Sequence, residues 1–374
     1  MKKLFVFAAS AMMVFASCTD NEIVYQNETP QEIGLFSVAN KMTRAATPTQ
    51  YAIDGTAFTH ANMAVAAYLA DGDDGVTTGD YFDKTEFTGS GSSFTGGRYW
   101  PIQASTLNFL AVAPEVKVEV DESETMTSGV TTEFGSVAQG DTKASNFASK
   151  ATVTVANNET NQYDVMYANG TGSKALSATP QSVSMLFNHA LAWVNFTFKA
   201  TSPGITINKV TVNGAKYNGT LTITNTGFDV TTGMTLTPEW SNQSGLAAVE
   251  GVVPGKDVII DNNQTKVLTI EEGETESDII TWGKGLLVVP CTAASFVVNY
   301  TVTVDGVSHD YNYTYDVTAN LAWVMGKKYN YNISMGLQEI EINPTVTEWP
   351  YWTDANDNDR KDPGEEHGKD ITIN

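Results

Sequence analysis

The residues with the clearest potential for chemistry lie together near the C-terminus. Oxygen-bearing side chains occupy positions 1, 3, 5, 9 and 12 of one twelve-residue stretch: Asp354, Asn356, Asn358, Asp362 and Glu365. An EF-hand-like calcium loop needs this spacing, because alternate residues of a tight loop point inward and a glutamate at position 12 closes the coordination shell. Position 6 holds Asp359, where such loops have glycine. Calcium is therefore the one cofactor that the sequence suggests and none is required, since a solvated, metal-free acidic tail fits equally well.

A second reactive group is the thiol of Cys18. It follows a short basic head, an apolar stretch over residues 4–15 and two small residues. The apolar stretch is shorter than the roughly 20 residues that cross a bilayer, so it predicts a signal peptide over residues 1–17. Residues 15–18, Phe-Ala-Ser-Cys, resemble a bacterial lipobox, in which the cysteine takes a diacylglycerol and becomes the first residue. The alternative is an ordinary secretory signal with an incidental cysteine.

Arginine is rare in this chain. Only Arg44, Arg98 and Arg360 occur, against 18 lysines, so an Arg-specific protease would find few targets. Arg44 lies in a polar segment, residues 41–48, that we expect to be an exposed loop. A short strand is predicted just before it, over residues 33–38. Arg44 is thus a candidate processing site, with an ordinary loop arginine as the alternative.

No catalytic signature is present. The four histidines, at positions 60, 189, 309 and 367, lie far apart, and none begins a His-Glu-x-x-His zinc motif. The Gly-x-Ser-x-Gly motif of hydrolases is absent. Cys291 is the only cysteine besides Cys18, so no disulfide framework exists. We expect a protein that is not an enzyme and whose stability comes from a packed core.

Composition narrows the classes of partner and fold. A formal charge of −22 would repel nucleic acid and anionic membrane surfaces. Short runs rich in Thr, Val, Tyr and Phe alternate with turn residues almost throughout, and no convincing helix is visible. Two hairpins are predicted: a strong one around Asp305-Gly306, between residues 296–304 and 311–317, and a weaker one around Asn213-Gly214. Residues 115–150 are predicted to form a long surface loop.

Many short strands without a βαβ rhythm predict an all-β protein built from antiparallel sandwiches, and the length is enough for two. We expect a tether and propeptide over residues 18–44, an N-terminal sandwich over 45–200, a C-terminal sandwich over 201–349 and an acidic tail over 350–374. A Ser-Pro-Gly segment near residue 203 marks the predicted joint between the two sandwiches.

Several weak patterns, taken in order, make the chain resemble the fimbrillins, lipoprotein pilins of Bacteroidetes, and specifically the group related to the minor-fimbrium subunit. They are the lipobox at Cys18, residues 42–45 (Met-Thr-Arg-Ala), 99–101, 107–114, 164–168, 183–191, Trp323 and 326–329 (Gly-Lys-Lys-Tyr). The resemblance implies two transthyretin-like sandwiches and a pilus subunit that polymerises and supports adhesion. It also implies lipoprotein export to the outer membrane, then cleavage after Arg44 that leaves Ala45 as the first residue.

Strand exchange gives this route a physical basis. If residues 33–38 pair in the first sandwich, a cut at Arg44 lets them leave and opens a sheet edge to another subunit's strand. A donor must be an alternating segment that can be released. Ile340, Ile342 and Val346 fit this pattern around Pro344, with a permanent last strand as the alternative, and Ile371 and Ile373 form a second candidate.

The expected partners are other pilin subunits, an Arg-specific protease, the outer membrane through the lipid, and a host or bacterial surface ligand. An accessory or tip adhesin of the same family is one rival reading. A surface glycan-binding lipoprotein is another, with Tyr351 or Trp352 stacking on sugar rings.

Overall fold

The computed structural model describes sixteen stretches of the chain: residues 30–37, 61–69, 79–90, 93–101, 106–119, 127–137, 147–156, 161–173, 182–229, 233–245, 258–260, 265–291, 294–317, 322–337, 339–348 and 371–372. Every named element in these stretches is a strand, which confirms the all-β expectation. None of the described residues belongs to a helix long and apolar enough to cross a membrane. Cys18, Arg44, Ala45, Ile373 and the predicted calcium loop from Asp354 to Glu365 lie outside the described residues.

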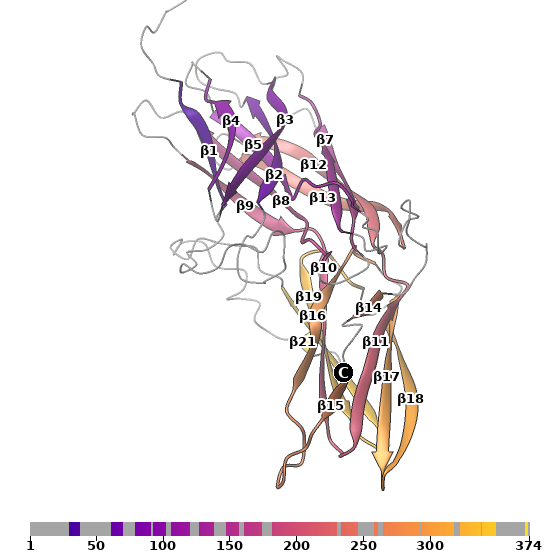
Figure 1. Ribbon diagram of the computed structural model, residues 1–374. Coiled ribbons are helices and arrows are strands. Elements are labelled where there is room, and N and C mark those ends of the chain that lie inside the picture. The colour runs from indigo at the N-terminus through magenta and orange to yellow at the C-terminus, as the bar shows by residue number, and fades with distance from the viewer. Residues whose placement is uncertain are drawn as a thin grey trace, which may run out of the picture.

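Seven strands form a closed, barrel-like sheet in the upper half of the molecule (Figure 1). In spatial order they are β1 (Glu32–Ser37), β4 (Ser93–Tyr99), β3 (Gly79–Ser90), β2 (Asn62–Leu69), β5 (Thr106–Ala113), β8 (Met166–Ser173) and β9 (Ser182–His189). Neighbours are antiparallel except β1 and β9, which run parallel and close the sheet. The enclosed core contains the aromatic side chains of Phe87, Phe94 and Phe109.

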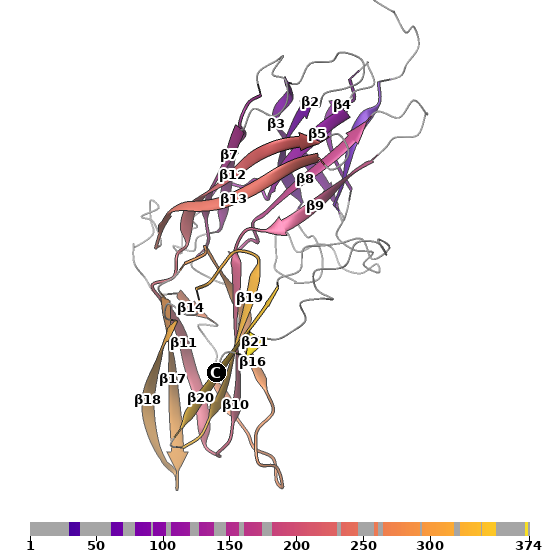
Figure 2. The ribbon, with the colours of Figure 1, turned by 180° about the vertical axis from the view of Figure 1, so that it is seen from behind.

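A four-stranded sheet covers one side of this barrel (Figures 1 and 2). Its order is β13 (Gly233–Ser244), β12 (Asn218–Asp229), β7 (Phe147–Thr154) and β6 (Gly129–Glu133). β2 explains why such a cover is needed. Met63 and Val65 belong to the barrel core, whereas Ala66 and Tyr68, on the other face, belong to a core shared with β7 and β12. A strand buried on both faces is apolar almost without alternation, as the segment Asn-Met-Ala-Val-Ala-Ala-Tyr-Leu is.

The lower half of the molecule contains two further sheets. One has the order β16 (Ile280–Val288), β10 (Ala192–Ala200), β19 (Lys327–Met335), β20 (Ile340–Glu348) and β21 (Ile371–Thr372). The other has the order β14 (Val258–Ile260), β11 (Ile205–Asn213), β17 (Ala294–Val304) and β18 (Val307–Val317), with β15 (Lys266–Leu268) also paired to β11. Phe196, Phe296 and Tyr331 meet between them, with ring centroids 4.8–5.5 Å apart. These sheets pack as a sandwich around an aromatic core.

The structure confirms one predicted hairpin and corrects the other. β17 and β18 pair without interruption from Val304–Val307 to Ala294–Val317, and Asp305 and Gly306 both have positive φ, at 52° and 80°, as the tight two-residue turn requires. The prediction of a hairpin around Asn213-Gly214 is wrong, because β11 and β12 do not pair with each other. Gly214 has a φ of 72°, so the chain turns there, but β12 crosses to β7 and β13 in a different sheet.

The chain crosses between the two halves more than once (Figure 1). β10 ends at residue 200 and pairs with β16 and β19, whereas β12 and β13, which come after that residue, belong to the sheet with β7. The division at residue 200 stays a prediction about folding units. The expectation of one long loop over residues 115–150 is wrong in part, because β6 and the start of β7 lie within it. β6 has five residues, too few to show a clear alternation in sequence.

Candidate functional site: the first strand and its groove

β1 is the strand predicted just upstream of Arg44, and it lies between two other strands of the barrel. On one side it pairs antiparallel with β4, where Leu35 is opposite Phe94. On the other side it pairs parallel with β9, where Leu35 is opposite Val183. The backbone of β1 is therefore hydrogen-bonded along both edges, and this short strand closes the barrel.

The side chains of β1 alternate between the core and the surface. Ile33 and Leu35 are fully buried in the barrel core, whereas Phe36 is 41% exposed. Burial of an aliphatic side chain of this size contributes roughly 1.5–3 kcal/mol, so Ile33 and Leu35 are the main apolar anchors of the strand. Between them, Gly34 passes close to β9, since a Cβ atom there would lie 3.4 Å from the Ser182 hydroxyl.

A bulge in β4 shapes the groove opposite Ile33. Glu32 is opposite Tyr99 and Gly34 opposite Thr95, so β4 has three residues, 96–98, where β1 has one. Gly97 takes a φ of 64° and its N–H donates a 3.1 Å hydrogen bond to the Glu32 carboxylate. A Cβ atom on Gly96 would lie 2.6 Å from the Phe87 ring. Glycine is therefore needed here both for the left-handed turn and for close approach to the core.

Without β1, this site would become an open groove. β4 and β9 would each lose a hydrogen-bonded neighbour, and the volume filled by Ile33 and Leu35 would open onto the apolar cluster of Phe94, Val183 and Met185. An unpaired strand edge beside apolar pockets binds an extended peptide well, because main-chain hydrogen bonds supply affinity and alternate side chains fix the register. With β1 removed, the site would therefore have the free backbone groups and the apolar volume that an extended strand needs.

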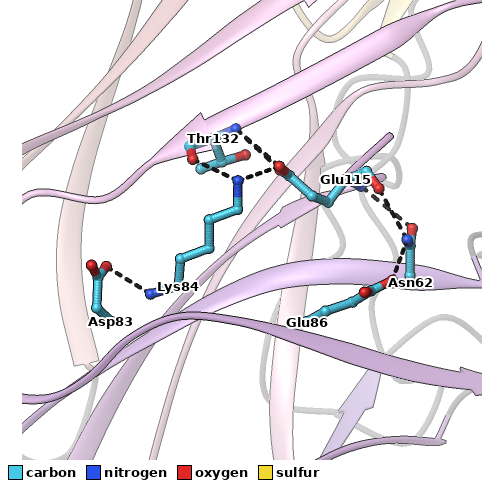
Figure 3. A network of polar contacts seen from close by, with 6 residues as sticks. All are labelled: Asn62, Asp83, Lys84, Glu86, Glu115 and Thr132. Carbon is cyan, nitrogen blue, oxygen red and sulfur yellow. Dashed lines mark hydrogen bonds and ion pairs between the residues drawn. The ribbon is translucent and has the colours of Figure 1, made fainter. Parts of the chain in front are cut away.

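β2 is the next strand that the structure describes after the Arg44 segment, and polar contacts fasten it to its neighbours (Figure 3). The Asn62 side chain, at the start of β2, donates hydrogen bonds to the Glu86 carboxylate at 2.7 Å and to the Glu115 carbonyl at 3.0 Å. The Glu115 carboxylate pairs with Lys84 and accepts a 3.1 Å hydrogen bond from the Thr132 N–H. These contacts join β2, β3 and β6, so a cut in residues 38–60 would leave the downstream chain attached to the barrel.

The C-terminal donor candidates occupy the lower sandwich. β20 pairs with β19 over its full length, and Ile340, Ile342 and Val346 are half-buried against the core. β21 adds to the far edge of β20, where Ile371 is opposite Val346. The structure thus describes the state in which β20 is the resident last long strand, and donation of either segment stays a prediction.

Comparison with known protein families shows to which family the chain belongs. A model of fimbrillin-like proteins matches residues 43–349. The chain belongs to the fimbrillin-like family. Membership supports a structural role as a fimbrial subunit, part of a cell-surface appendage. No curated protein sequence matches this chain.

The search of solved structures also returned similar chains. A fimbrial protein from Bacteroides vulgatus matches with a TM-score of 0.44 and 15% identity, covering 85% of this chain and 99% of that chain. A fimbrial assembly protein from Parabacteroides distasonis matches with a TM-score of 0.36 and 12% identity, covering 86% of this chain and 97% of that chain.

The histidines and acidic residues of this fimbrillin-like protein form no metal centre in the part of the chain that the structure describes. His189 and Asp164 are buried, and the His189 Nδ1 lies 2.7 Å from an Asp164 carboxylate oxygen. Ala190, next in the chain, accepts a 2.9 Å hydrogen bond from the Trp240 indole N–H. These contacts surround the passage from β9 to β10, which agrees with a structural role for His189. His60 and His367 lie outside the described residues.

Sequence reasoning identified β1 but missed the strands that hold it. Residues 182–189 alternate, with Val183, Met185 and Phe187 all buried, so β9 carried a detectable strand signal. Its parallel pairing with β1 carried none, because the two strands are about 145 residues apart and nothing local joins them. The β4 bulge was likewise hidden in the small residues around Gly96 and Gly97.

Proposed function

We propose that this chain is a fimbrial subunit that is exported as a lipoprotein on Cys18, cut after Arg44 and polymerised by exchange of β1 for another subunit's strand. The observation that carries the proposal is the position of β1. It lies between β4 and β9 with Ile33 and Leu35 fully buried, and the candidate cleavage site follows a few residues later.

The energetics favour a replacement of β1 over its simple loss. Exposure of Ile33 and Leu35 would cost roughly 3–6 kcal/mol, before the loss of backbone hydrogen bonds on both edges of the strand is counted. A cut at Arg44 frees the end of β1 but leaves these contacts in place. An incoming donor strand that fills the same pockets offsets the cost, so exchange is expected to proceed with the donor present.

The donor is proposed to come from the C-terminal region. A released β20 would present Ile340, Ile342 and Val346, and the last residues would present Ile371 and Ile373. Calcium bound by the loop from Asp354 to Glu365 would fix the position of the last segment. Isothermal titration calorimetry of the full chain with calcium tests this metal site. A binding heat no larger than that of a Glu365→Gln variant would contradict calcium binding by this loop.

Controlled proteolysis tests the main proposal. The full chain treated with an Arg-specific protease should gain Ala45 as its N-terminus and form ladders that resist SDS. Arg44→Ala should block both events. Arg98→Ala is the matched control and should leave both unchanged, because the Arg98 side chain is held on the barrel by a 2.9 Å hydrogen bond from its Nε to the Thr85 hydroxyl and by its position over the Phe82 ring. Complete cleavage after Arg44 with the protein still monomeric would contradict strand exchange.

Export and position in the fibre need separate measurements. Metabolic labelling with palmitate should mark the wild-type chain and not a Cys18→Ser variant. Immunogold labelling of fimbriae should decorate the shaft if the chain is a stalk subunit supporting adhesion, whereas label confined to the ends would make it a tip adhesin.

A further inference from the structure

β18 forms the outer edge of the lower sandwich. In both views it is the outermost strand on its side, with β17 as its neighbour (Figures 1 and 2). It spans eleven residues, Val307–Val317, and every one pairs with β17 without a bulge. Within the stretches that the structure describes, no strand pairs with its other edge. A long, regular edge of this kind presents a row of backbone donors and acceptors to another chain.

Most other sheet ends have features that discourage pairing. β6, β14 and β21 have only five, three and two residues. β13 contains Pro238 and two register shifts against β12. β16 has glycines with positive φ at 283 and 285, next to a register shift. β18 has neither proline, lysine, bulge nor glycine, and its two aspartates, Asp310 and Asp316, are the only charged side chains on this edge at neutral pH.

The sequence of β18 fits a second copy of itself. We propose that two copies of this chain associate by antiparallel pairing of their β18 edges, around a two-fold axis at Asn312. This register overlaps the whole strand and sets Asn312 opposite Asn312 of the second copy. It pairs Val307 with Val317, Ser308 with Asp316, His309 with Tyr315, Asp310 with Thr314, and Tyr311 with Tyr313.

Charge complementarity supports this register. Each aspartate is opposite a hydroxyl, which can donate a hydrogen bond to the carboxylate, and no carboxylate is opposite another. Asp310 already accepts a 2.6 Å hydrogen bond from Thr301 within its own chain, and its remaining lone pairs can accept one from Thr314 of the second copy. A register centred on residue 313 would instead place Asp310 opposite Asp316, which repulsion disfavours.

The aromatic side chains add an apolar stripe across the same edge. Tyr300 and Tyr311 stack with ring centroids 5.4 Å apart, and Phe296 and Tyr315 stack at 5.0 Å. Tyr311 remains 46% exposed and Val307 remains 55% exposed. In the proposed pair, the tyrosines of one copy would continue those of the other on one face, and aromatic cross-strand pairs stabilise sheets. Exposed side chains that pair in this way gain burial on association.

Sedimentation equilibrium of the uncut full chain with Cys18→Ser tests the proposal without lipid or strand exchange. The chain should form dimers in a concentration-dependent way, more strongly at high salt, because salt screens the repulsion between two copies of net charge −22. Thr314→Asp should weaken the dimer by about fivefold or more, since it sets a second carboxylate opposite Asp310 at two symmetric places. Thr314→Lys is the matched control and should dimerise at least as well as the parent.

Cross-linking tests the register. In the same background, Asn312→Cys should form a disulfide between copies under mild oxidation, because each Cys would be opposite itself. Ser308→Cys should not, since its opposite residue is Asp316, and the parent chain controls for the buried Cys291. A chain that stays monomeric at high concentration and salt, or a dimer indifferent to Thr314→Asp, would overturn the proposal. Equal cross-linking by both cysteine variants would overturn the register.

Discussion

Leu35 offers the sharpest test of whether β1 occupies a groove shaped to hold it. Leu35 is fully buried in the barrel core, and its neighbour Phe36 points the other way and is 41% exposed. Leu35→Ala should lower the free energy of unfolding of the uncut chain by about 2–5 kcal/mol, because it removes buried methyl groups and leaves a cavity. Phe36→Ala is the matched control and should cost about 1 kcal/mol, since much of that ring is already in water.

Urea unfolding followed by tryptophan fluorescence measures the first effect, because Trp100 belongs to the same buried cluster as Leu35. The second effect is kinetic. After cleavage at Arg44, β1 carrying Leu35→Ala should leave its groove more than about tenfold faster than wild type, which corresponds to a loss of only about 1.4 kcal/mol of the contacts that resist release. Earlier appearance of SDS-resistant ladders would report it. Equal effects of Leu35→Ala and Phe36→Ala on stability would refute the reasoning that Leu35 anchors the strand.

Three further predictions concern the scaffold. Asp164→Ala should lower the free energy of unfolding by about 1.5–3 kcal/mol in urea titrations, because it removes the buried partner of His189; a loss below 0.5 kcal/mol would contradict that role. Burial raises the pKa of Tyr167 from 10.0 to about 12, so between these pH values the unfolded chain loses a proton that the folded chain keeps, and stability should fall as pH rises. Tyr167→Phe should reduce this fall between pH 10 and 12, and an unchanged pH profile would count against the assignment. Gly306→Ala should lower the free energy of unfolding by about 1 kcal/mol in thermal unfolding, because a residue with a Cβ atom is strained at a φ of 80°. The added Cβ atom would meet no neighbour, so no clash adds to this cost, and a neutral result would mean that the turn relaxes.

Local signals predicted the parts of the fold that depend on neighbours in sequence. The Asp305-Gly306 hairpin was predictable because its turn needs positive φ at two adjacent residues, which this pair of residue types tolerates. Asn213-Gly214 has the same local chemistry but no hairpin. There, β12 buries Leu221 and Ile223 in the core that it shares with β2 and β7, and it pairs with β7 and β13. Packing between distant segments therefore overrode the local turn signal.

The candidate site likewise has parts that the local sequence predicted and parts that it did not. The strand pattern of β1 was visible in residues 33–38, and Arg44 stood out because arginine is rare. The groove was not visible, since it is made by β4 and β9, and the β1–β9 pairing joins residues that no local rule connects. The β18 edge was also hidden, because the sequence showed a good hairpin but not which of its strands would lack a second neighbour.

By itself the sequence determined the strand-rich class, the tight hairpin, the export and processing hypotheses and the resemblance to fimbrillins, since alternation, turn chemistry and short motifs are properties of adjacent residues. Only the tertiary structure decided which strands pair, that β1 closes a barrel with Ile33 and Leu35 inside, and that β18 ends its sheet. The physical reason is that strand pairing satisfies backbone groups and buries apolar faces across large sequence separations. The choice among alternative partners therefore depends on the packing of the whole chain.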